Sequence, residues 1–226
     1  MLRNVPWVRG MSSLVKDVEY LCGGRTCLEL AFGDERWSYK QGFEASWNAD
    51  RWFIHFLSWG PWQSTWSLWE GMDRRYTTIG RPIGKLSEAQ ARSVARGMGR
   101  LGHTFQAHVE AYLVGLNEFL ASRGLGMVAF ENSIRNLGWR KGRRHLRMAC
   151  GVGEGSNAKV LDCWVRDRLR LRSFPVDSVV RAVVTSSAYG LPVDSDKLVE
   201  LAHAVGRNPR FVARATWQFG SELVDD

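Results

Sequence analysis

The stretch GVGEGSNAKVLDCWVRDRLRLRSFPVDSVV, residues 151–180, carries the strongest functional pattern in this chain. It starts with Gly-Val-Gly, and a glycine on each side of one valine favours a tight turn. Lys159 follows, and Asp177 comes eighteen positions later, after a Pro-Val pair and before an apolar run. Asp is a preferred helix N-cap, so Asp177 is predicted to cap a helix. Each residue alone is ordinary, but together they are candidates for a nucleophile and its partner.

Apolar residues recur at helical spacing along most of the chain and predict an all-α protein. The clearest case is residues 103–124, where a long apolar face ends at Gly124. Ser87 is predicted to cap one helix, and Asn48 or Asp50 another.

The first 45 residues are more mixed than the rest of the chain. Residues 12–21 are predicted to form a short helix with a serine cap. Residues 27–42 allow either a small β-hairpin about Gly33 and Asp34 or irregular structure.

Length and composition indicate a folded protein with a sizeable core. The chain has 226 residues, enough for one large or two small domains, and 45% of them are hydrophobic. No apolar run reaches the length that spans a bilayer, and the first residues lack the apolar core of a signal peptide. We therefore expect a cytoplasmic protein without a membrane segment.

The chain is strongly basic, with a formal net charge of +8 and a pI near 9.7. Arginine-rich runs at residues 139–147 and 166–172 lie close to Gly151 and Lys159. Such clustering favours an anion-binding face, and nucleic acid is the commonest polyanion that such a face meets. The alternative is a general arginine bias of the whole chain, which would say nothing about a partner.

Cysteines and histidines give no sign of a metal site. The four cysteines contain no Cys-x-x-Cys pair, and the five histidines show no ligand spacing, so we expect reduced thiols and no metal. Eight of the eleven tryptophans lie within the first 69 residues. A tryptophan-rich core is the favoured interpretation, and a base-stacking surface is the alternative.

Residues 148–182 resemble the helix-hairpin-helix DNA glycosylase superfamily (HhH-GPD), most closely its 8-oxoguanine DNA glycosylase and AP lyase branch. The resemblance rests on the order of a Gly-Val-Gly hairpin, the Lys-Val-x-Asp-Cys segment and the Pro-Val-Asp segment. It implies that Lys159 is the nucleophile, that Asp177 is the catalytic aspartate, and that Cys163 lies near the base pocket. The residues EGSNA, 154–158, lengthen the hairpin relative to the family pattern, which affects its expected grip on phosphate.

The resemblance also implies a fold and a domain organisation. It predicts a two-lobed helical protein with the active site in the cleft between the lobes. The small N-terminal β-hairpin stays an open alternative that rests on residues 27–42 alone. Residues 1–45 would pack with the C-terminal helices, residues 46–158 would form a helical barrel lobe ending in the helix-hairpin-helix, and residues 159–226 would form the C-terminal lobe. The expected protein is a compact monomer of prokaryotic or archaeal type, associated with the nucleoid.

Further site residues follow from the same resemblance and from the demands of base flipping. Backbone groups of Gly151, Val152 and Gly153 would hold a DNA phosphate, with a monovalent cation at the hairpin and no other cofactor. Arg144 and Arg147 are expected to contact the DNA backbone. A stacking pocket for the flipped base would draw on Cys163, Trp164, Trp217, Gln218 and Phe219. Core packing is the alternative role for Cys163, Trp217 and Phe219.

Three functions remain open from the sequence. The leading one is a base-excision repair glycosylase with AP lyase activity, which removes 8-oxoguanine from double-stranded DNA through a lysine Schiff base. The second is a monofunctional glycosylase of the same fold that acts on another purine lesion. The third is a non-catalytic helix-hairpin-helix DNA-binding protein.

Overall fold

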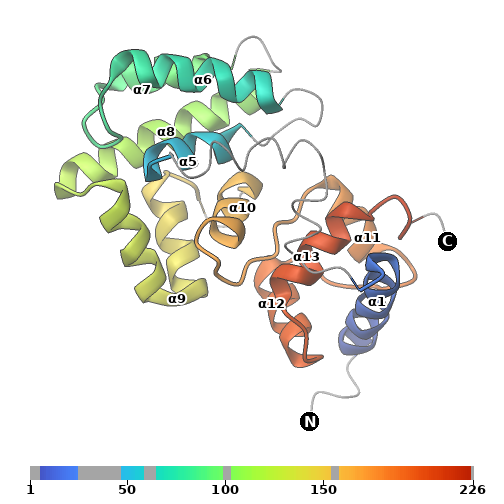
Figure 1. Cartoon of the computed structure of the whole chain (residues 1–226). Helices are drawn as coiled ribbons and strands as arrows, with labels where there is room; N and C mark the ends of the chain where they lie inside the picture. Colours follow the sequence, from blue (N-terminus) through green and yellow to red (C-terminus); the bar gives the residue numbers. More distant parts are fainter. Residues whose placement is uncertain (1–5, 25–46, 59–64, 99–102, 154–157, 225–226) are drawn as a thin grey trace. The chain divides into compact units, whose positions relative to one another are not determined.

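The computed structural model describes residues 6–24, 47–58, 65–98, 103–153 and 158–224, and these residues form ten α-helices and no strand (Figure 1). The all-α prediction is therefore confirmed for the described part of the chain. The hairpin predicted at residues 27–42 lies outside the described residues, as does Cys27.

The chain divides into two compact units. One unit, here called the central unit, is continuous and spans Trp47–Leu169. The other, here called the discontinuous unit, combines Met1–Ser46 with Arg170–Asp226. The domain boundary predicted after residue 158 falls inside the central unit, because the helix that starts at Lys159 belongs to that unit.

The described central unit holds six helices joined by short connections: α5 (Ala49–Leu57), α6 (Thr65–Ile79), α7 (Glu88–Arg96), α8 (His103–Arg123), α9 (Met127–Ala149) and α10 (Lys159–Asp167). The predicted start signals are confirmed. Asn48 caps α5 by accepting from the Arg51 N–H, and Ser87 forms a reciprocal capping box with Gln90 at the start of α7. Gly124 ends α8 in the left-handed region, at φ 62°.

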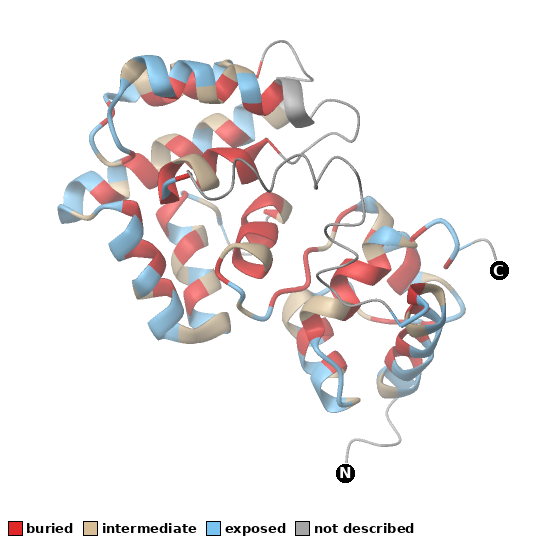
Figure 2. Cartoon of the chain, in the orientation of Figure 1, coloured by how far each residue is buried: buried red, intermediate tan, exposed pale blue. Residues whose placement is uncertain are grey.

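The core of the central unit gathers around α10, which packs against α5 and α9. Trp164 is fully buried there, and its ring meets Phe53 of α5 edge to face at 5.5 Å between centroids. Buried residues recur along each of these helices, and α10 is buried over most of its length (Figure 2). Trp47 and Trp69 are also buried, with their rings stacked at 5.0 Å, so these two tryptophans serve the core.

A glycine pair sets the approach of α6 to α7. A Cβ on Gly71 would lie 1.9 Å from the carbonyl oxygen of Gly97, a separation that no side chain tolerates. The two backbones therefore touch directly at this point, which explains why both positions lack a side chain.

The helix α9 is interrupted in its middle. Gly138 has φ 74° and ψ 175°, so the segment is two helices joined at a kink. The second half carries the basic run and leads directly into the Gly-Val-Gly turn.

In the discontinuous unit, α1 (Pro6–Cys22) packs against α12 (Ser195–Ala204) and α13 (Pro209–Gln218), and α13 also packs against α11 (Ser178–Thr185). The predicted serine cap for α1 is wrong, because this helix begins at Pro6. The Ser12 hydroxyl instead donates to the carbonyl of Val8 within the helix. Proline at a helix start costs no hydrogen bond, which lets α1 begin earlier than the serine suggested.

Distant parts of the sequence meet within this unit. The Tyr189 hydroxyl donates to Asp17 of α1 at 2.9 Å, and a Cβ on Gly10 would lie 1.9 Å from the Tyr189 carbonyl oxygen. Close packing at Gly10 thus holds α1 against the segment that follows α11. Across the described ranges, no helix is both long and apolar enough to cross a membrane.

Candidate functional site

The end of α9 closes tightly into the Gly-Val-Gly turn. Gly151 has φ 69°, and its N–H donates to the Met148 carbonyl at 3.0 Å. The Val152 N–H donates to the Arg147 carbonyl at 2.8 Å. This pair of bonds is a Schellman motif, in which a left-handed glycine satisfies the last carbonyls of the helix. Two of the three backbone donors expected to hold phosphate therefore bond within the chain, and the phosphate prediction rests on Gly153.

The turn is supported from α8. A Cβ on Gly115 would lie 2.8 Å from the Cys150 carbonyl carbon and 3.2 Å from the Gly151 nitrogen. The backbone of α8 thus reaches the first residues of the turn directly, which fixes where the turn leaves α9.

Lys159 is the first residue of α10 and is half-buried. Residues 162, 163 and 166 follow it at spacings of three, four and seven, so Asp162, Cys163 and Arg166 share its side of the helix. This face contains two cations, one carboxylate and one thiol within two turns.

Asp162 is bound by two arginines of α9. Its Oδ2 accepts from Nη2 of Arg147 at 3.0 Å, and its Oδ1 lies 3.6 Å from Nε of Arg143. The three side chains are 4%, 15% and 13% exposed, respectively for Asp162, Arg147 and Arg143. The Arg147 side chain, expected at the DNA backbone, is thus engaged with Asp162, whereas Arg144 is exposed.

Cys163 is buried beside these charges. Burial raises the pKa of its thiol to about 11, with Arg166 and Lys159 acting in the opposite direction and Asp167 and Asp162 adding to the rise. The thiol is therefore protonated at neutral pH and behaves as a small buried apolar group. Arg166 is itself buried and forms a two-point ion pair with Asp167, at 2.8 and 2.7 Å.

The remaining pocket candidates differ in their surroundings. Trp164 has no exposed surface and contacts Phe53, which favours core packing over base stacking. Trp217 is half-buried, with the Arg214 guanidinium 4.9 Å from its ring centroid. Gln218 is exposed and ends α13, and Phe219 follows it as a half-buried C-cap.

Asp177 caps α11 in the discontinuous unit, as predicted. Its Oδ1 accepts from the Val180 N–H at 2.8 Å, and the residue is 8% exposed. This cap fixes the carboxylate rigidly. Lys159 belongs to the central unit, so the two candidate catalytic residues stand on different units of the chain.

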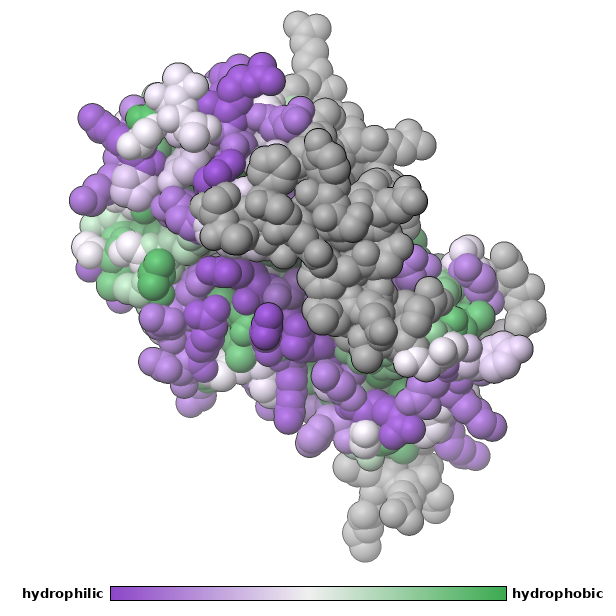
Figure 3. All heavy atoms as spheres, in the orientation of Figure 1, coloured by the Kyte–Doolittle hydropathy of each residue, from purple (hydrophilic) through white to green (hydrophobic). Residues whose placement is uncertain are grey.

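The second half of α9 carries a basic stripe. Arg140, Lys141 and Arg144 are exposed, and Met148, one turn beyond Arg144, is 68% exposed. Hydrophilic side chains dominate the described surface in the view of Figure 3. The stripe leads toward the Gly-Val-Gly turn and presents three cations to solvent.

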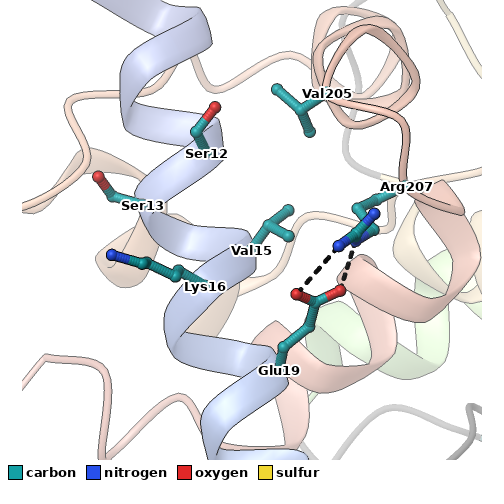
Figure 4. Close-up of a pocket in the computed structure, with 7 residues that line it drawn as sticks. All are labelled: Ser12, Ser13, Val15, Lys16, Glu19, Val205 and Arg207. Atoms are coloured by element: carbon teal, nitrogen blue, oxygen red, sulfur yellow. Dashed lines mark hydrogen bonds and ion pairs between the residues drawn. The ribbon is translucent and has the colours of Figure 1, made fainter.

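A separate pocket of about 430 Å³ lies in the discontinuous unit, between α1 and the segment after α12 (Figure 4). It is lined by Ser12, Ser13, Val15, Lys16, Glu19, Val205 and Arg207. Glu19 and Arg207 form an ion pair across one side of it. None of the predicted site residues lines this pocket.

Among the described residues, no group of three or more His, Cys, Asp or Glu side chains is placed to hold a metal ion. In comparisons with known proteins, the chain matches no family model, no curated protein and no solved structure. The glycosylase relationship therefore remains a resemblance carried by residues 148–182.

Sequence reasoning missed the arginine pair on Asp162. The signal was present, because Arg143 and Arg147 are four residues apart on one helix face and Asp162 is three residues from Lys159. The sequence alone does not show the pairing, because both arginines lie in one basic run and nothing local indicates that a carboxylate of another helix binds them.

Proposed function

We propose that this protein is a DNA base-excision repair glycosylase with AP lyase activity, which removes 8-oxoguanine through a Schiff base at Lys159. One observation carries the proposal: Lys159 starts the second of two helices joined by a Gly-Val-Gly turn, in a segment that resembles this enzyme branch. The proposed partner is double-stranded DNA, bound by a monomer in the cytoplasm.

The proposed reaction begins with attack of the neutral Lys159 amine on C1′ of the damaged nucleotide. The C1′–N9 bond breaks, and the base leaves with a proton. The sugar ring then opens to an imine between C1′ and Nζ. Loss of a C2′ proton eliminates the 3′ phosphate, and water hydrolyses the imine to free the lysine.

Asp177 is proposed to stabilise positive charge on the sugar. The transition state of glycosidic cleavage is oxocarbenium-like, and a fixed carboxylate stabilises it without reorganising. A rigid N-cap is suited to this role, because its side-chain position is already determined by the Val180 N–H.

DNA binding in this proposal uses the basic stripe of α9. Arg140, Lys141 and Arg144 are spaced along one exposed helix face, where each can contact a phosphate. Binding should weaken as salt rises, and removal of one stripe cation should reduce the slope of log K against log salt by about one.

Borohydride trapping tests the nucleophile. The protein is incubated with a duplex containing one 8-oxoguanine, borohydride is added, and a covalent complex is sought on a denaturing gel. Lys159→Gln should abolish the trapped complex. Lys85→Gln, which removes an exposed lysine outside the stripe, is the matched control and should retain it.

The outcomes separate the three candidate functions. Base release without trapping would indicate a monofunctional glycosylase and would sink the lysine mechanism. Tight DNA binding without base release from any purine lesion would indicate a non-catalytic binding protein.

A second matched pair tests Asp177. Asp194 also caps a helix of the same unit, accepting from the Lys197 N–H at 2.9 Å, but it is exposed. Asp177→Asn should lower the rate of base release by about 100-fold or more, whereas Asp194→Asn should leave it unchanged. Equal rates of base release in the two variants would show that Asp177 serves only as a helix cap.

A further inference from the structure

The start of α10 lacks the usual means of fixing a helix N-terminus. Its N-cap is Ala158, at φ −123° and ψ 45°, which offers no side-chain acceptor. By comparison, α5, α7, α11, α12 and α13 all have a side-chain cap. Lys159 therefore stands at a helix end that local capping does not hold.

Asp162 supplies the missing anchor from one turn further along. Its carboxylate lies in the first turn of α10, where a negative charge is favourable to the helix dipole. The ion pairs with Arg147 and Arg143 tie this turn to the last two turns of α9. The Asp162 N–H also donates to the Ala158 carbonyl at 3.1 Å, which makes the carboxylate part of the turn that begins at Lys159.

Arg147 connects this anchor to the hairpin. Its carbonyl accepts the Val152 N–H, which closes the Gly-Val-Gly turn, and its side chain donates to Asp162. Arg147 thus bonds to both ends of the segment between α9 and α10. Its backbone carbonyl bonds to the Gly-Val-Gly turn, and its guanidinium bonds to the first turn of α10. Tyr112 of α8 lies near the same charges, and burial is the main cause of its raised pKa.

We propose that Asp162 is a positioning residue for Lys159: its ion pairs with Arg143 and Arg147 fix the first turn of α10, and with it the amine, relative to the hairpin. The role in catalysis rests on the proposed function, whereas the positioning of the Lys159 turn does not. Asp162 acts through Lys159 and contacts no reacting atom in this proposal.

The positioning is tested first without DNA. Intact protein is treated with formaldehyde and cyanoborohydride, and methylation of Lys159 and of exposed Lys141 is followed by mass spectrometry of their peptides. In Asp162→Asn, loosening of the first turn should raise the methylation rate of Lys159 by about tenfold, with Lys141 unchanged. The control is Asp73→Asn, which removes the charge from the two-point Arg51–Asp73 pair of α5 and α6, and should alter neither rate.

The role in catalysis is tested by single-turnover borohydride trapping on 8-oxoguanine duplex. Asp162→Asn should lower the trapping rate constant by about 100-fold, because a displaced nucleophile loses its near-attack geometry. The Kd for the same duplex should stay within about twofold of wild type, since the α9 stripe is untouched. If Asp162→Asn fails to fold, Asp162→Glu keeps the charge. It should show the faster Lys159 methylation and the slower trapping to a smaller degree.

The methylation experiment and the trapping experiment test different claims. If wild-type protein traps no DNA, the proposed function is wrong, and the methylation arm still decides the positioning of Lys159. Unchanged Lys159 methylation in a folded Asp162 variant would overturn the inference. A trapping rate constant that falls and a Kd that rises by the same factor would show that Asp162 supports DNA binding and not the placement of the amine.

Discussion

The described parts of the two units differ in the polar contacts that each makes within itself. In the described central unit, ion pairs join separate helices: Arg51 with Asp73, Arg168 with Glu131, and Arg143 and Arg147 with Asp162. In the described part of the discontinuous unit, the buried carboxylate is Asp177, which bonds to the backbone of its own helix. The ion pair of Glu19 with Arg207, which joins α1 to the segment between α12 and α13 in that unit, is largely exposed.

This difference predicts how each unit fails. A buried ion pair is sensitive to loss of one partner, because the other charge stays behind without compensation. A cap is worth about 1 kcal/mol, and an exposed pair less still. Single charge removals should therefore damage the central unit more than the discontinuous unit.

The largest effect is expected from Arg168→Ala. Arg168 donates two hydrogen bonds to Glu131, at 2.9 and 3.1 Å, and Glu131 is 2% exposed. Loss of the guanidinium leaves this buried carboxylate without those bonds and should lower the free energy of unfolding by about 3 kcal/mol, measured by urea denaturation. Glu19→Ala, which breaks the exposed pair of the discontinuous unit, is the control and should cause almost no change. Equal losses of unfolding free energy in the two variants would show that the units do not differ in their sensitivity to charge removal.

Glycine contacts offer a comparison in which the two units should behave alike. Gly71 in the central unit and Gly10 in the discontinuous unit each face a carbonyl oxygen that a Cβ would approach to 1.9 Å. Gly71→Ala and Gly10→Ala should each destabilise by about 2 kcal/mol, because the facing backbone must move away to admit the methyl group. Gly126→Ala is a control with open space around its Cβ, and thermal unfolding compares all three.

A smaller effect is expected at the caps of the discontinuous unit. Asp194→Ala should lower the free energy of unfolding by about 1 kcal/mol, since it loses its bond to the Lys197 N–H. Asp177→Ala should lower it by at least as much, since its carboxylate is buried and bonds to the Val180 N–H. Matching losses in urea denaturation would show that the stability role of Asp177 is that of an ordinary cap. A much larger loss at Asp177 would show that its carboxylate makes a buried interaction comparable to the ion pairs of the central unit.

The smallest effect concerns pH and the carboxyl of Asp50 in α5. Burial is the main cause of its raised pKa, and nearby Glu131 adds to the rise. Because the folded pKa lies above the unfolded value of 3.8, the contribution of Asp50 to stability is full below that pH and declines as pH rises through the folded pKa. Asp50→Asn should remove this decline, which urea denaturation at a series of pH values between 3 and 7 would detect. Parallel pH curves for the variant and the wild type would contradict the assignment.

Much of the fold was accessible from local sequence signals. Ser87, Asn48, Asp177 and Gly124 each marked the helix boundary that the structure has, because capping and left-handed glycines are decided within a few residues. The start of α1 was missed because Pro6 begins a helix as well as the later serine does, and no local signal ranks the two.

The sequence nominates residues for the candidate site but does not predict their surroundings. The pattern marked Lys159 and Asp177, whereas the burial of Trp164 and the engagement of Arg147 with Asp162 depend on how α9 and α10 pack. The sequence of a basic run predicts that its arginines face solvent. Only the packing of the helices shows that a carboxylate of another helix lies beside Arg147. The sequence also assigned α10 to the C-terminal lobe, because chain order says nothing about which neighbour a helix packs against.

The packing of α1 against α12 and α13 bears on how the protein is made. The Asp17–Tyr189 bond spans 172 positions, and the whole central unit is translated in between. At about 5–20 residues per second, α1 leaves the ribosome roughly 10–30 s before its partners. During that interval its apolar face, with Leu14 and Val18, has none of these partners to cover it. The discontinuous unit can therefore complete its packing only after the central unit has been translated, and α1 waits longest for its partners.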